Sequence, residues 1–367
     1  MRAVAFATLL VQLLSSCDTQ RPDPLPGIPT EGAVVITYRD SLFAASLAAE
    51  NRASRSVQLG GGRFSEVGIP ADVSHLLGDG RLAVFVRDRQ PTSFPSRKFI
   101  EVDATNPEQP KVLGDPGDGL YAAVVSESGA PYGLTRRDDE ACRGWAIVRM
   151  EGTVSRILVC TGEIGEDVRP QRLFVSDDEE TVAFSYLRSG RVFGERQDLA
   201  VFAGGTSEPR FFYDVTQGVS DMRYSPTTGT LYLVDFTFGT VVGLELEAGG
   251  MRTLVPPRTT DPDGANLFLL EDTLITFQRD SATGTTSVLF IDVVLEDRRE
   301  YTLPFLIFQA SENDGYLLFR TFVQTSGRPE TFVGLCASSP ESFDTFTLDL
   351  PAFARETALF SHTLGCE

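Results

Sequence analysis

Histidine is nearly absent from this 367-residue chain, which contains only His75 and His362. A Ser-His-Asp triad would have to use one of these two residues, and no GxSxG motif accompanies either of them. The sequence also has no CxxC motif and no Cys/His pair, which argues against a zinc site. We therefore interpret both histidines as structural and predict no catalytic residue, no cofactor and no zinc ligand.

The chain also lacks an apolar run long enough to span a membrane. Its most apolar stretch, Ala3 to Leu14, contains 12 residues and follows the positively charged Arg2. As a helix this stretch would be about 18 Å long, well short of the roughly 30 Å hydrocarbon core. It therefore predicts the apolar segment of a signal peptide covering residues 1–16.

The end of this segment carries a more specific pattern. Leu14-Ser15-Ser16-Cys17 resembles the bacterial lipobox, in which an apolar residue and two small residues precede the cysteine that becomes acylated, for example with palmitate. The resemblance implies lipidation at Cys17, and the alternative is an ordinary secretory signal with an incidental cysteine. By the lipobox sorting rule, Asp18 points weakly to the inner membrane.

Residues 17–30 form the expected tether between the anchor and a folded body. The segment from Asp18 to Pro29 contains four prolines and has no apolar periodicity, as in an extended linker. We therefore expect the protein to be anchored by lipid in the cell membrane or outer membrane, facing the periplasm or the exterior. The remaining residues, 31–367, would form one folded domain.

From Ala33 onward the pattern predicts β-strands throughout, with no helical periodicity beyond a turn or two. The stretch from Val219 to Val255 contains four short strand-like runs separated by turns, such as Ser225-Pro226-Thr227-Thr228-Gly229. Its length of roughly 40 residues is that of one four-stranded propeller blade. A lone sheet of this kind would leave apolar faces in water, so it needs similar neighbours.

The same unit recurs at a nearly constant period. The predicted second strands of successive units begin near positions 33, 82, 131, 181, 230, 273 and 316. This recurrence predicts an all-β fold, a seven-bladed β-propeller with four-stranded antiparallel blades. The competing architecture is a pair of β-sandwiches, but no linker or change in composition divides the middle of the chain.

Two segments resemble known propeller repeats of the broad WD40-like type. The segment from Lys98 to Gly114 looks like the strand-turn-strand of LVIVD repeats, and the segment from Arg172 to Tyr186 resembles a blade opening of TolB-like propellers. These resemblances imply a propeller and are too degenerate to name one family.

Closure of the ring supplies a further prediction. The first unit shows three strands where the others show four, and the segment from Thr357 to Leu364 is a spare strand. We predict that it pairs with Ala33 to Tyr38 and thereby removes the exposed sheet edges of an open ring.

After Cys17, four cysteines remain, an even number that suggests disulfide bonds in an exported chain. Cys142 and Cys160 lie symmetrically about the expected turn at Glu151-Gly152, which predicts that they face each other and form a disulfide. Cys336 is then left to pair with Cys366. The alternative is four inert buried thiols. Trp145, the only tryptophan, is expected in the core beside Cys142.

Acidic residues are frequent but fall mostly in turns, where carboxylates bond their own backbone. Such clusters are Asp138-Asp139-Glu140, Asp177-Asp178-Glu179-Glu180 and Glu312-Asn313-Asp314-Gly315. The segment containing Asp261, Asp263 and Asn266 is a weak calcium candidate, because alternating oxygen ligands can wrap Ca²⁺. It lacks the remaining ligands and the terminal bidentate Glu of an EF-hand loop.

The net charge of −19 repels phosphate backbones, so nucleic acid is not an expected partner. The leading hypothesis is a monomeric, lipid-anchored binding or scaffold module for a protein, peptide or glycan partner. The runner-up is a hydrolase or lactonase with a metal bound in the central channel. The enzyme hypothesis predicts carboxylates with perturbed pKa values around the channel, whereas the binding hypothesis predicts exposed aromatic side chains. A third reading is a purely structural envelope lipoprotein.

Overall fold

The computed structural model describes a large part of the chain between residues 33 and 366. The described ranges are 33–38, 41–47, 54–58, 64–67, 74–76, 81–88, 97–103, 109–113, 120–126, 128–152, 154–161, 164, 168–191, 195–204, 206, 208–235, 239–257, 266–321, 329–351 and 359–366. None of these residues belongs to a helix long and apolar enough to cross a membrane.

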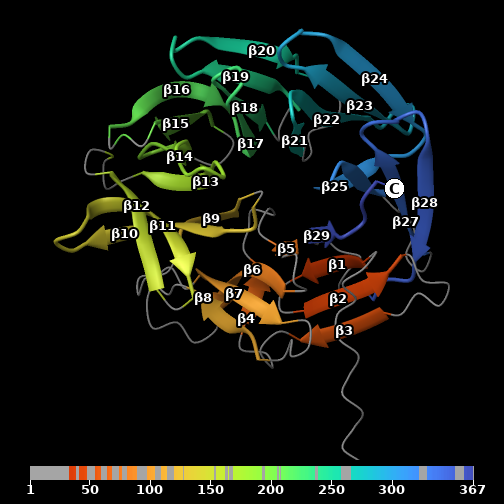
Figure 1. The fold of residues 1–367 in the computed structure, drawn as a ribbon, viewed down its shortest axis with the longest axis horizontal. Coiled ribbons are helices and arrows are strands. Elements are labelled where there is room, and N and C mark those ends of the chain that lie inside the picture. The colour runs from red at the N-terminus through yellow and green to blue at the C-terminus, as the bar shows by residue number, and fades with distance from the viewer. Residues whose placement is uncertain are drawn as a thin grey trace, which may run out of the picture.

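The described strands form seven antiparallel sheets, six of four strands and one of five. Figure 1 shows the sheets arranged as blades around a common axis, in chain order. This confirms the predicted seven-bladed β-propeller. The second strands of the blades begin at residues 33, 81, 131, 182, 230, 273 and 316, within one residue of the predicted positions.

The first three blades contain these strands. Blade 1 comprises β29 (Leu359–His362), β1 (Ala33–Tyr38), β2 (Ser41–Ser46) and β3 (Ser54–Gln58). Blade 2 comprises β4 (Phe64–Val67), β5 (Ser74–Leu76), β6 (Arg81–Asp88), β7 (Arg97–Asp103) and β8 (Lys111–Leu113). Blade 3 comprises β9 (Ala122–Val125), β10 (Pro131–Asp138), β11 (Arg143–Glu151) and β12 (Val154–Thr161).

The other four blades are regular four-stranded meanders. Blade 4 comprises β13 (Arg169–Val175), β14 (Val182–Leu187), β15 (Gln197–Phe202) and β16 (Arg210–Thr216). Blade 5 comprises β17 (Val219–Ser225), β18 (Thr230–Asp235), β19 (Val241–Glu245) and β20 (Met251–Val255). Blade 6 comprises β21 (Leu267–Leu270), β22 (Thr273–Asp280), β23 (Thr285–Asp292) and β24 (Arg298–Leu303). Blade 7 comprises β25 (Ile307–Asn313), β26 (Tyr316–Thr321), β27 (Glu330–Cys336) and β28 (Phe343–Leu348).

Blade 2 departs from the predicted pattern at its inner edge. Two short strands, β4 and β5, pair with different halves of β6. The inner edge of β6 is therefore covered in two pieces.

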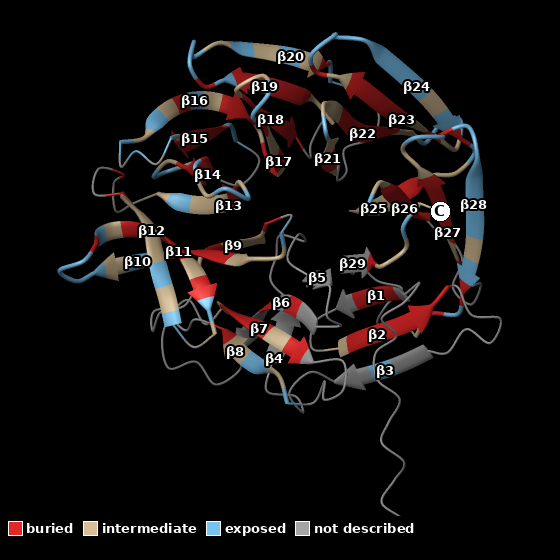
Figure 2. Cartoon of the chain, viewed as in Figure 1, coloured by how far each residue is buried: buried red, intermediate tan, exposed pale blue. Residues whose placement is uncertain are grey.

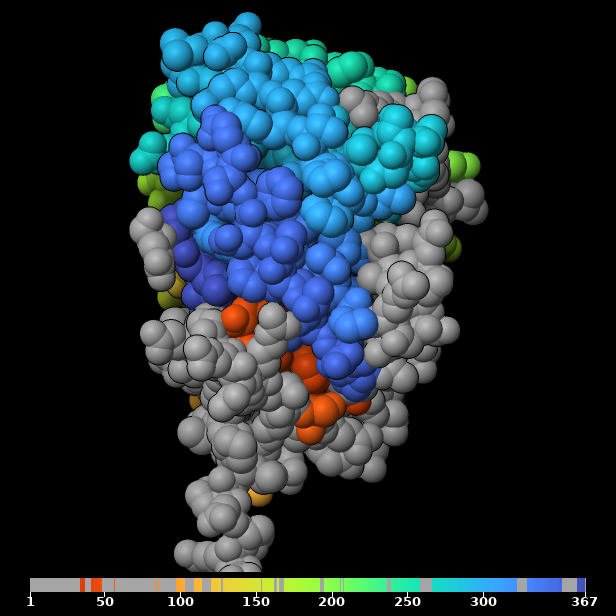
Figure 3. All heavy atoms as spheres, turned by 90° about the vertical axis from the view of Figure 1, so that its right-hand side faces the viewer, coloured from red at the N-terminus to blue at the C-terminus, as the bar shows by residue number. Residues whose placement is uncertain are grey.

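The ring is closed as predicted by a strand from the C-terminus. β29 pairs antiparallel with β1 and places Val34 opposite His362 and Thr37 opposite Leu359. Blade 1 therefore combines the last strand of the chain with the first three. In the side view of Figure 3, the blue C-terminal blade lies directly against the orange N-terminal strands.

The core lies between the blades rather than in a single centre. Apolar clusters join blades 2 and 3, 3 and 4, 4 and 5, 5 and 6, 6 and 7, and 7 and 1. Figure 2 shows the same gradient, with buried middle strands and exposed outer strands such as β24 and β28. Each large buried side chain contributes about 1.5–3 kcal/mol, which explains why continuous apolar runs, as in β14 and β18, occupy the middle of the blades.

Buried polar side chains hold the connections between consecutive blades. The Gln197 side-chain oxygen accepts a hydrogen bond from Val219 N at 3.3 Å, and Asp235 accepts one from Gln217 N at 3.0 Å. Thr286 Oγ1 accepts a hydrogen bond from Ile307 N at 3.1 Å. Because a buried amide without a partner would be costly, these bonds fix the path by which one blade leads to the next.

Candidate functional site

The most unusual backbone among the described blades is a β-bulge on the outer strand of blade 4. Gln197 pairs with Thr216 and Leu199 pairs with Phe212, so Asp198 alone stands opposite the three residues from Tyr213 to Val215. Asp214, within this bulge, has a φ of 51°. Non-glycine residues adopt such values at a cost of about 1–3 kcal/mol, and bulges re-aim side chains at binding sites.

The buried Asp198 side chain fixes the bulge through hydrogen bonds. Its side chain is 0% exposed, and its Oδ1 accepts hydrogen bonds from the backbone N of Asp214 at 2.8 Å and from Nη2 of Arg188 at 2.9 Å. Nε of Arg188 donates to the other carboxylate oxygen. The guanidinium neutralises a buried charge, and the hydrogen bond that Arg188 donates to Asp198 raises the pKa of Arg188 above its ordinary value.

Arg188 in turn flanks an exposed aromatic side chain. Its guanidinium carbon lies 5.0 Å from the centroid of the Tyr213 ring, a cation–π distance. The Phe211 ring stacks with Tyr213 at a centroid distance of 6.1 Å and an interplanar angle of 13°. Tyr213 is nevertheless 59% exposed. We call Arg188, Asp198, Phe211, Tyr213 and Asp214 the blade-4 site.

Two more arginines border this site. Arg191 Nη1 donates to Asp214 Oδ1 at 2.7 Å, and Arg196 Nη1 donates to the Asp214 backbone oxygen at 2.9 Å. The hydrogen bond from Arg191 holds the pKa of Asp214 below its ordinary value. The acidic groups of the site are therefore engaged by arginines of the same blade.

A second group of polar residues lies on the innermost strands. Asp221 Oδ2 accepts a hydrogen bond from Leu267 N of the next blade at 3.1 Å, and Asn266 Oδ1 accepts one from Ala310 N of the blade after it at 3.2 Å. These two bonds repeat the same link at equivalent places in successive blades. They satisfy inner-edge amides that have no strand partner.

Glu312, on β25, is the inner-strand carboxyl with the most perturbed environment among those described. Burial raises its pKa, an effect opposed by a hydrogen bond from Gly315 N at 2.8 Å and by the positive charge of Arg223 on β17. Arg223 also forms an ion pair with Asp221 at 2.6 Å. Glu312 is therefore a partly buried carboxyl whose pKa is raised by burial and partly restored by the charge of Arg223.

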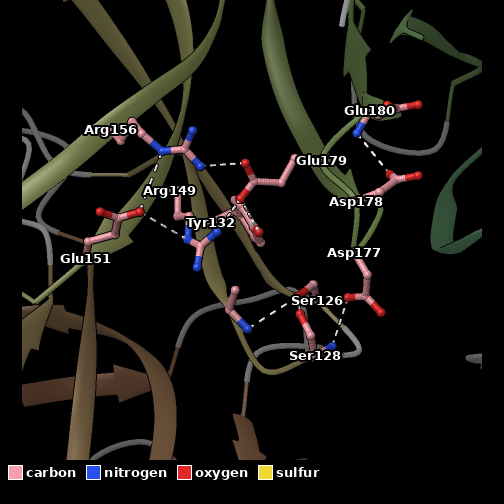
Figure 4. A network of polar contacts seen from close by, with 11 residues as sticks. Ser126, Ser128, Tyr132, Arg149, Glu151, Arg156, Asp177, Asp178, Glu179 and Glu180 are labelled. Carbon is pink, nitrogen blue, oxygen red and sulfur yellow. Dashed lines mark hydrogen bonds and ion pairs between the residues drawn. The ribbon is translucent and has the colours of Figure 1, made fainter. Parts of the chain in front are cut away.

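A third network joins blades 3 and 4 (Figure 4). Glu179, on the turn between β13 and β14, points toward three strands of blade 3. Its Oε1 accepts hydrogen bonds from Tyr132 at 2.9 Å and Arg149 at 2.6 Å, and its Oε2 accepts one from Arg156 at 2.5 Å. Its side chain is 17% exposed. The expectation that the carboxylates of this turn bond their own backbone is therefore wrong for Glu179, although Asp178 fits it by accepting from Glu180 N.

The other two acidic clusters bond their own turns as expected. Asp139 Oδ1 accepts from the backbone N of Ala141 and of Cys142, both at 2.9 Å. Glu312 accepts from Gly315 N three residues later.

Both predicted disulfides are present, Cys142–Cys160 and Cys336–Cys366, with Cα–Cα distances of 5.6 and 5.7 Å. The predicted register of the first pair is wrong. Glu151 pairs with Val154, so the hairpin is centred later in the chain than predicted, and a bulge between Ile147 and Val148 shifts the register by one more residue. Cys160 therefore stands opposite Ala146 rather than Cys142. Cys142 precedes β11 and packs in one cluster with Ala146 and Cys160, which brings the sulfurs together.

Trp145 and His362, both singled out from the sequence, are buried. Trp145 is 3% exposed and lies in the core between blades 3 and 4. His362 is 2% exposed on β29, where Nε2 donates to Ser311 O at 3.2 Å and Nδ1 accepts from Leu364 N at 3.2 Å. It is a structural histidine of the closing strand. His75 lies on β5, and its side chain is outside the described residues.

The calcium and lipid candidates fall mostly beyond the described ranges. Asp261, Asp263 and Cys17 lie outside them, whereas the Asn266 side chain bonds the Ala310 amide. Within the described part of the chain, no group of three or more His, Cys, Asp or Glu residues is placed to hold a metal ion.

Sequence reasoning missed the blade-4 site. The stretch from Phe211 to Tyr213 reads as an ordinary strand, and nothing in it marks a bulge. Asp198 was the available signal, because a charged residue in an apolar strand must find a partner.

Comparison with known proteins supports the fold and no closer relationship. The sequence matches no protein-family model and no curated protein. A periplasmic gluconolactonase of Pseudomonas aeruginosa aligns with a TM-score of 0.52 and 10% identity, covering 89% of this chain and 98% of that one. A putative 6-phosphogluconolactonase of Bacteroides fragilis aligns with a TM-score of 0.51 and 9% identity, covering 87% and 96%.

Propeller-containing peptidases are also similar. A puromycin-hydrolysing peptidase of Mycobacterium tuberculosis has a TM-score of 0.53 and 14% identity, covering 90% of this chain. This chain spans only 57% of that longer protein. At such identities the likeness establishes a shared propeller architecture alone.

Proposed function

We propose that this protein is a lipid-anchored β-propeller of the cell envelope that binds a protein partner through the blade-4 site. One observation carries the proposal. Tyr213 is 59% exposed, although Phe211 and Arg188 hold its ring in place. Exposed aromatics are the feature expected of a binding module rather than of a purely structural protein.

The composition of the site favours a protein or peptide over a glycan. Tyr and Arg are among the residue types most enriched at the energetic centres of protein interfaces. Because Asp198 fixes Arg188 before binding, little side-chain entropy is lost when a partner docks.

The envelope location in this proposal rests on the signal-like start, the lipobox-like Cys17 and two disulfides, since disulfides persist in oxidising compartments. An anchored module at a membrane surface meets its partner at a raised local concentration.

The test is site-specific photocrosslinking in intact cells of the native host. A photoreactive phenylalanine analogue replaces Tyr213 in one variant and Leu295, 77% exposed on blade 6, in the control. We expect a discrete crosslinked protein from position 213 only. Equal adducts from both positions, or none from position 213, would overturn the proposal.

A second candidate function is hydrolysis, for example of a lactone, at the inner strands. Burial of Glu312 and its raised pKa beside Arg223 suit a general acid or base. Two structures of similar architecture are described as lactonases. The test measures hydrolysis of gluconolactone by the wild type and by Glu312→Gln, with and without a chelator. Activity above buffer that Glu312→Gln abolishes would support this candidate, and a wild-type rate equal to buffer would exclude it for this substrate.

A further inference from the structure

We infer that the blade-4 site recognises an acidic segment of its partner, with a carboxylate bound to Arg188 beside the Tyr213 ring. This inference rests on the proposed binding function and names the chemistry of the ligand. It depends on which hydrogen-bonding groups of the site are already used and which are presented outward.

Most of the acceptor oxygens of the site already accept hydrogen bonds. Asp198 uses both carboxylate oxygens on Arg188, and its Oδ1 also accepts from Asp214 N. Asp214 Oδ1 accepts a hydrogen bond from Arg191, and Asp214 Oδ2 lies 3.9 Å from Nη2 of Arg188. An incoming ammonium or guanidinium group could reach Asp214 Oδ2, but it would lie against the positive charges of Arg188 and Arg191, which repel it.

Arg188, in contrast, has an N–H group that is available to a ligand. Arg188 binds Asp198 through Nε and Nη2, and no described residue accepts a hydrogen bond from its third nitrogen, Nη1. The Arg188 side chain is 41% exposed. A guanidinium has five N–H donors and no acceptor, so Nη1 is suited to an oxygen ligand, and a carboxylate gives the strongest such bond.

Arginines are concentrated at the site, whereas the whole chain is acidic. Arg188, Arg191 and Arg196 surround the carboxylates of Asp198 and Asp214, and the exposed Glu195 adjoins Arg196 in the sequence, whereas the whole chain carries a net charge of −19. The field of the protein repels acidic segments from most of its surface, and the blade-4 site attracts them locally. This contrast would direct an acidic ligand to one place.

The ligand must also satisfy the apolar part of the site. Tyr213 offers a rigid exposed ring, and Phe211 extends the apolar surface next to it. A segment in which a Glu or Asp adjoins an apolar side chain fits both parts, because the carboxylate reaches Arg188 while the neighbour packs on Tyr213.

The experiment compares fluorescent peptides by anisotropy against the full chain. One peptide alternates Glu and Leu, and its matched counterparts alternate Gln and Leu or Lys and Leu. A hydrogen bond to a charged group is worth about 1.5–3 kcal/mol, so we expect the Glu peptide to bind about tenfold more tightly than the Gln peptide or better. The Lys peptide should bind more weakly than both at this site.

Three variants locate the effect. Arg188→Lys keeps a cation for Asp198, but a single ammonium nitrogen replaces the planar fork and no nitrogen stands at the position of Nη1, so the preference for Glu over Gln should fall to near unity. Tyr213→Ser should weaken Glu and Gln peptides alike. Arg298→Gln on blade 6 changes an arginine of similar exposure, 38%, and should alter nothing. Melting temperatures confirm that each variant is folded.

Equal binding of the Glu and Gln peptides to the wild type, or an undiminished preference in Arg188→Lys, would overturn this inference. The proposed function would survive that result if crosslinking at position 213 still captured a partner. If crosslinking also failed, both would fall.

Discussion

Glu179 of blade 4 accepts a 2.6 Å hydrogen bond from Arg149 of blade 3, so a carboxylate on one blade is bound by a guanidinium of its neighbour. Arg156 and Tyr132 bond the same carboxylate. We expect Glu179→Gln to lower the free energy of unfolding by about 1 kcal/mol, because charge-assisted bonds at a partly exposed site are lost. Chemical denaturation at neutral pH measures this difference.

Glu180 provides the matched control for this substitution. It lies in the same turn, is exposed, and points away from the network in Figure 4. Glu180→Gln should change stability by less than about 0.5 kcal/mol. Since the network lowers the pKa of Glu179, its contribution is present above pH 4.5 and is lost as the pH falls through the lowered value. Wild type and Glu179→Gln should therefore converge in acid, and a constant difference would contradict this account.

A second prediction concerns His362 and the closing strand. Burial lowers the pKa of His362 from 6.5 to about 4, and its Nδ1 accepts from Leu364 N, which a protonated ring could not do. The folded state therefore binds fewer protons than the unfolded state between these values. The contribution of neutral His362 to the free energy of unfolding should be fully present above pH 6.5. On the order of 3 kcal/mol of it should be lost as the pH approaches 4.

Comparison of variants separates this effect from the titration of carboxylates. His362→Gln should remove the loss of stability between pH 6.5 and 5, a window in which ordinary carboxylates stay ionised. His75→Gln, which changes the other histidine, should retain it. Thermal unfolding across this window gives the answer, and identical pH profiles for both variants would count against the role of His362.

The period of the blades could be predicted because each blade repeats one local pattern. An apolar run such as Leu231 to Val234 must be covered on both faces, and turns such as that ending at Gly229 separate the strands. The spare C-terminal strand followed from counting three strands in the first unit. These features depend on neighbours in sequence or on simple completion of a ring.

The candidate site could not be predicted because it depends on register and on contacts between distant segments. Asp198 meets Arg188 across β14 and β15, and it meets Asp214 because a bulge in β16 places three residues opposite one. Glu179 reads as one more acidic turn residue until blade 3 is folded beside it. For the pair Cys142 and Cys160 the right conclusion came from the wrong register, since the hairpin is centred later in the chain than predicted and also contains a bulge.

The two disulfides are expected to stabilise different parts of the ring. Each disulfide constrains the unfolded chain by closing a loop, so removing either one should lower the free energy of unfolding by about 3 kcal/mol. Replacing Cys336 and Cys366 by Ser should in addition raise amide exchange in β1 and β29, because that bond ties the end of the closing strand to blade 7. The double replacement of Cys142 and Cys160 serves as the control and should leave exchange in β1 unchanged.

The last prediction concerns the anchor. Leu14-Ser15-Ser16-Cys17 predicts that the mature chain begins at an acylated Cys17, because the thiol is the only nucleophile there able to carry a lipid thioether. In the native host, metabolic labelling with a palmitate analogue should mark the wild type and should leave Cys17→Ser unlabelled. The replacement should also move the protein from the membrane to the soluble fraction, since no other segment of the sequence is long and apolar enough to hold it. Ser16→Ala, which keeps a small residue before the cysteine, should preserve labelling. Equal labelling of wild type and Cys17→Ser, or a mature N-terminus at another residue, would show that the anchor was wrongly assigned while leaving the propeller and its blade-4 site intact.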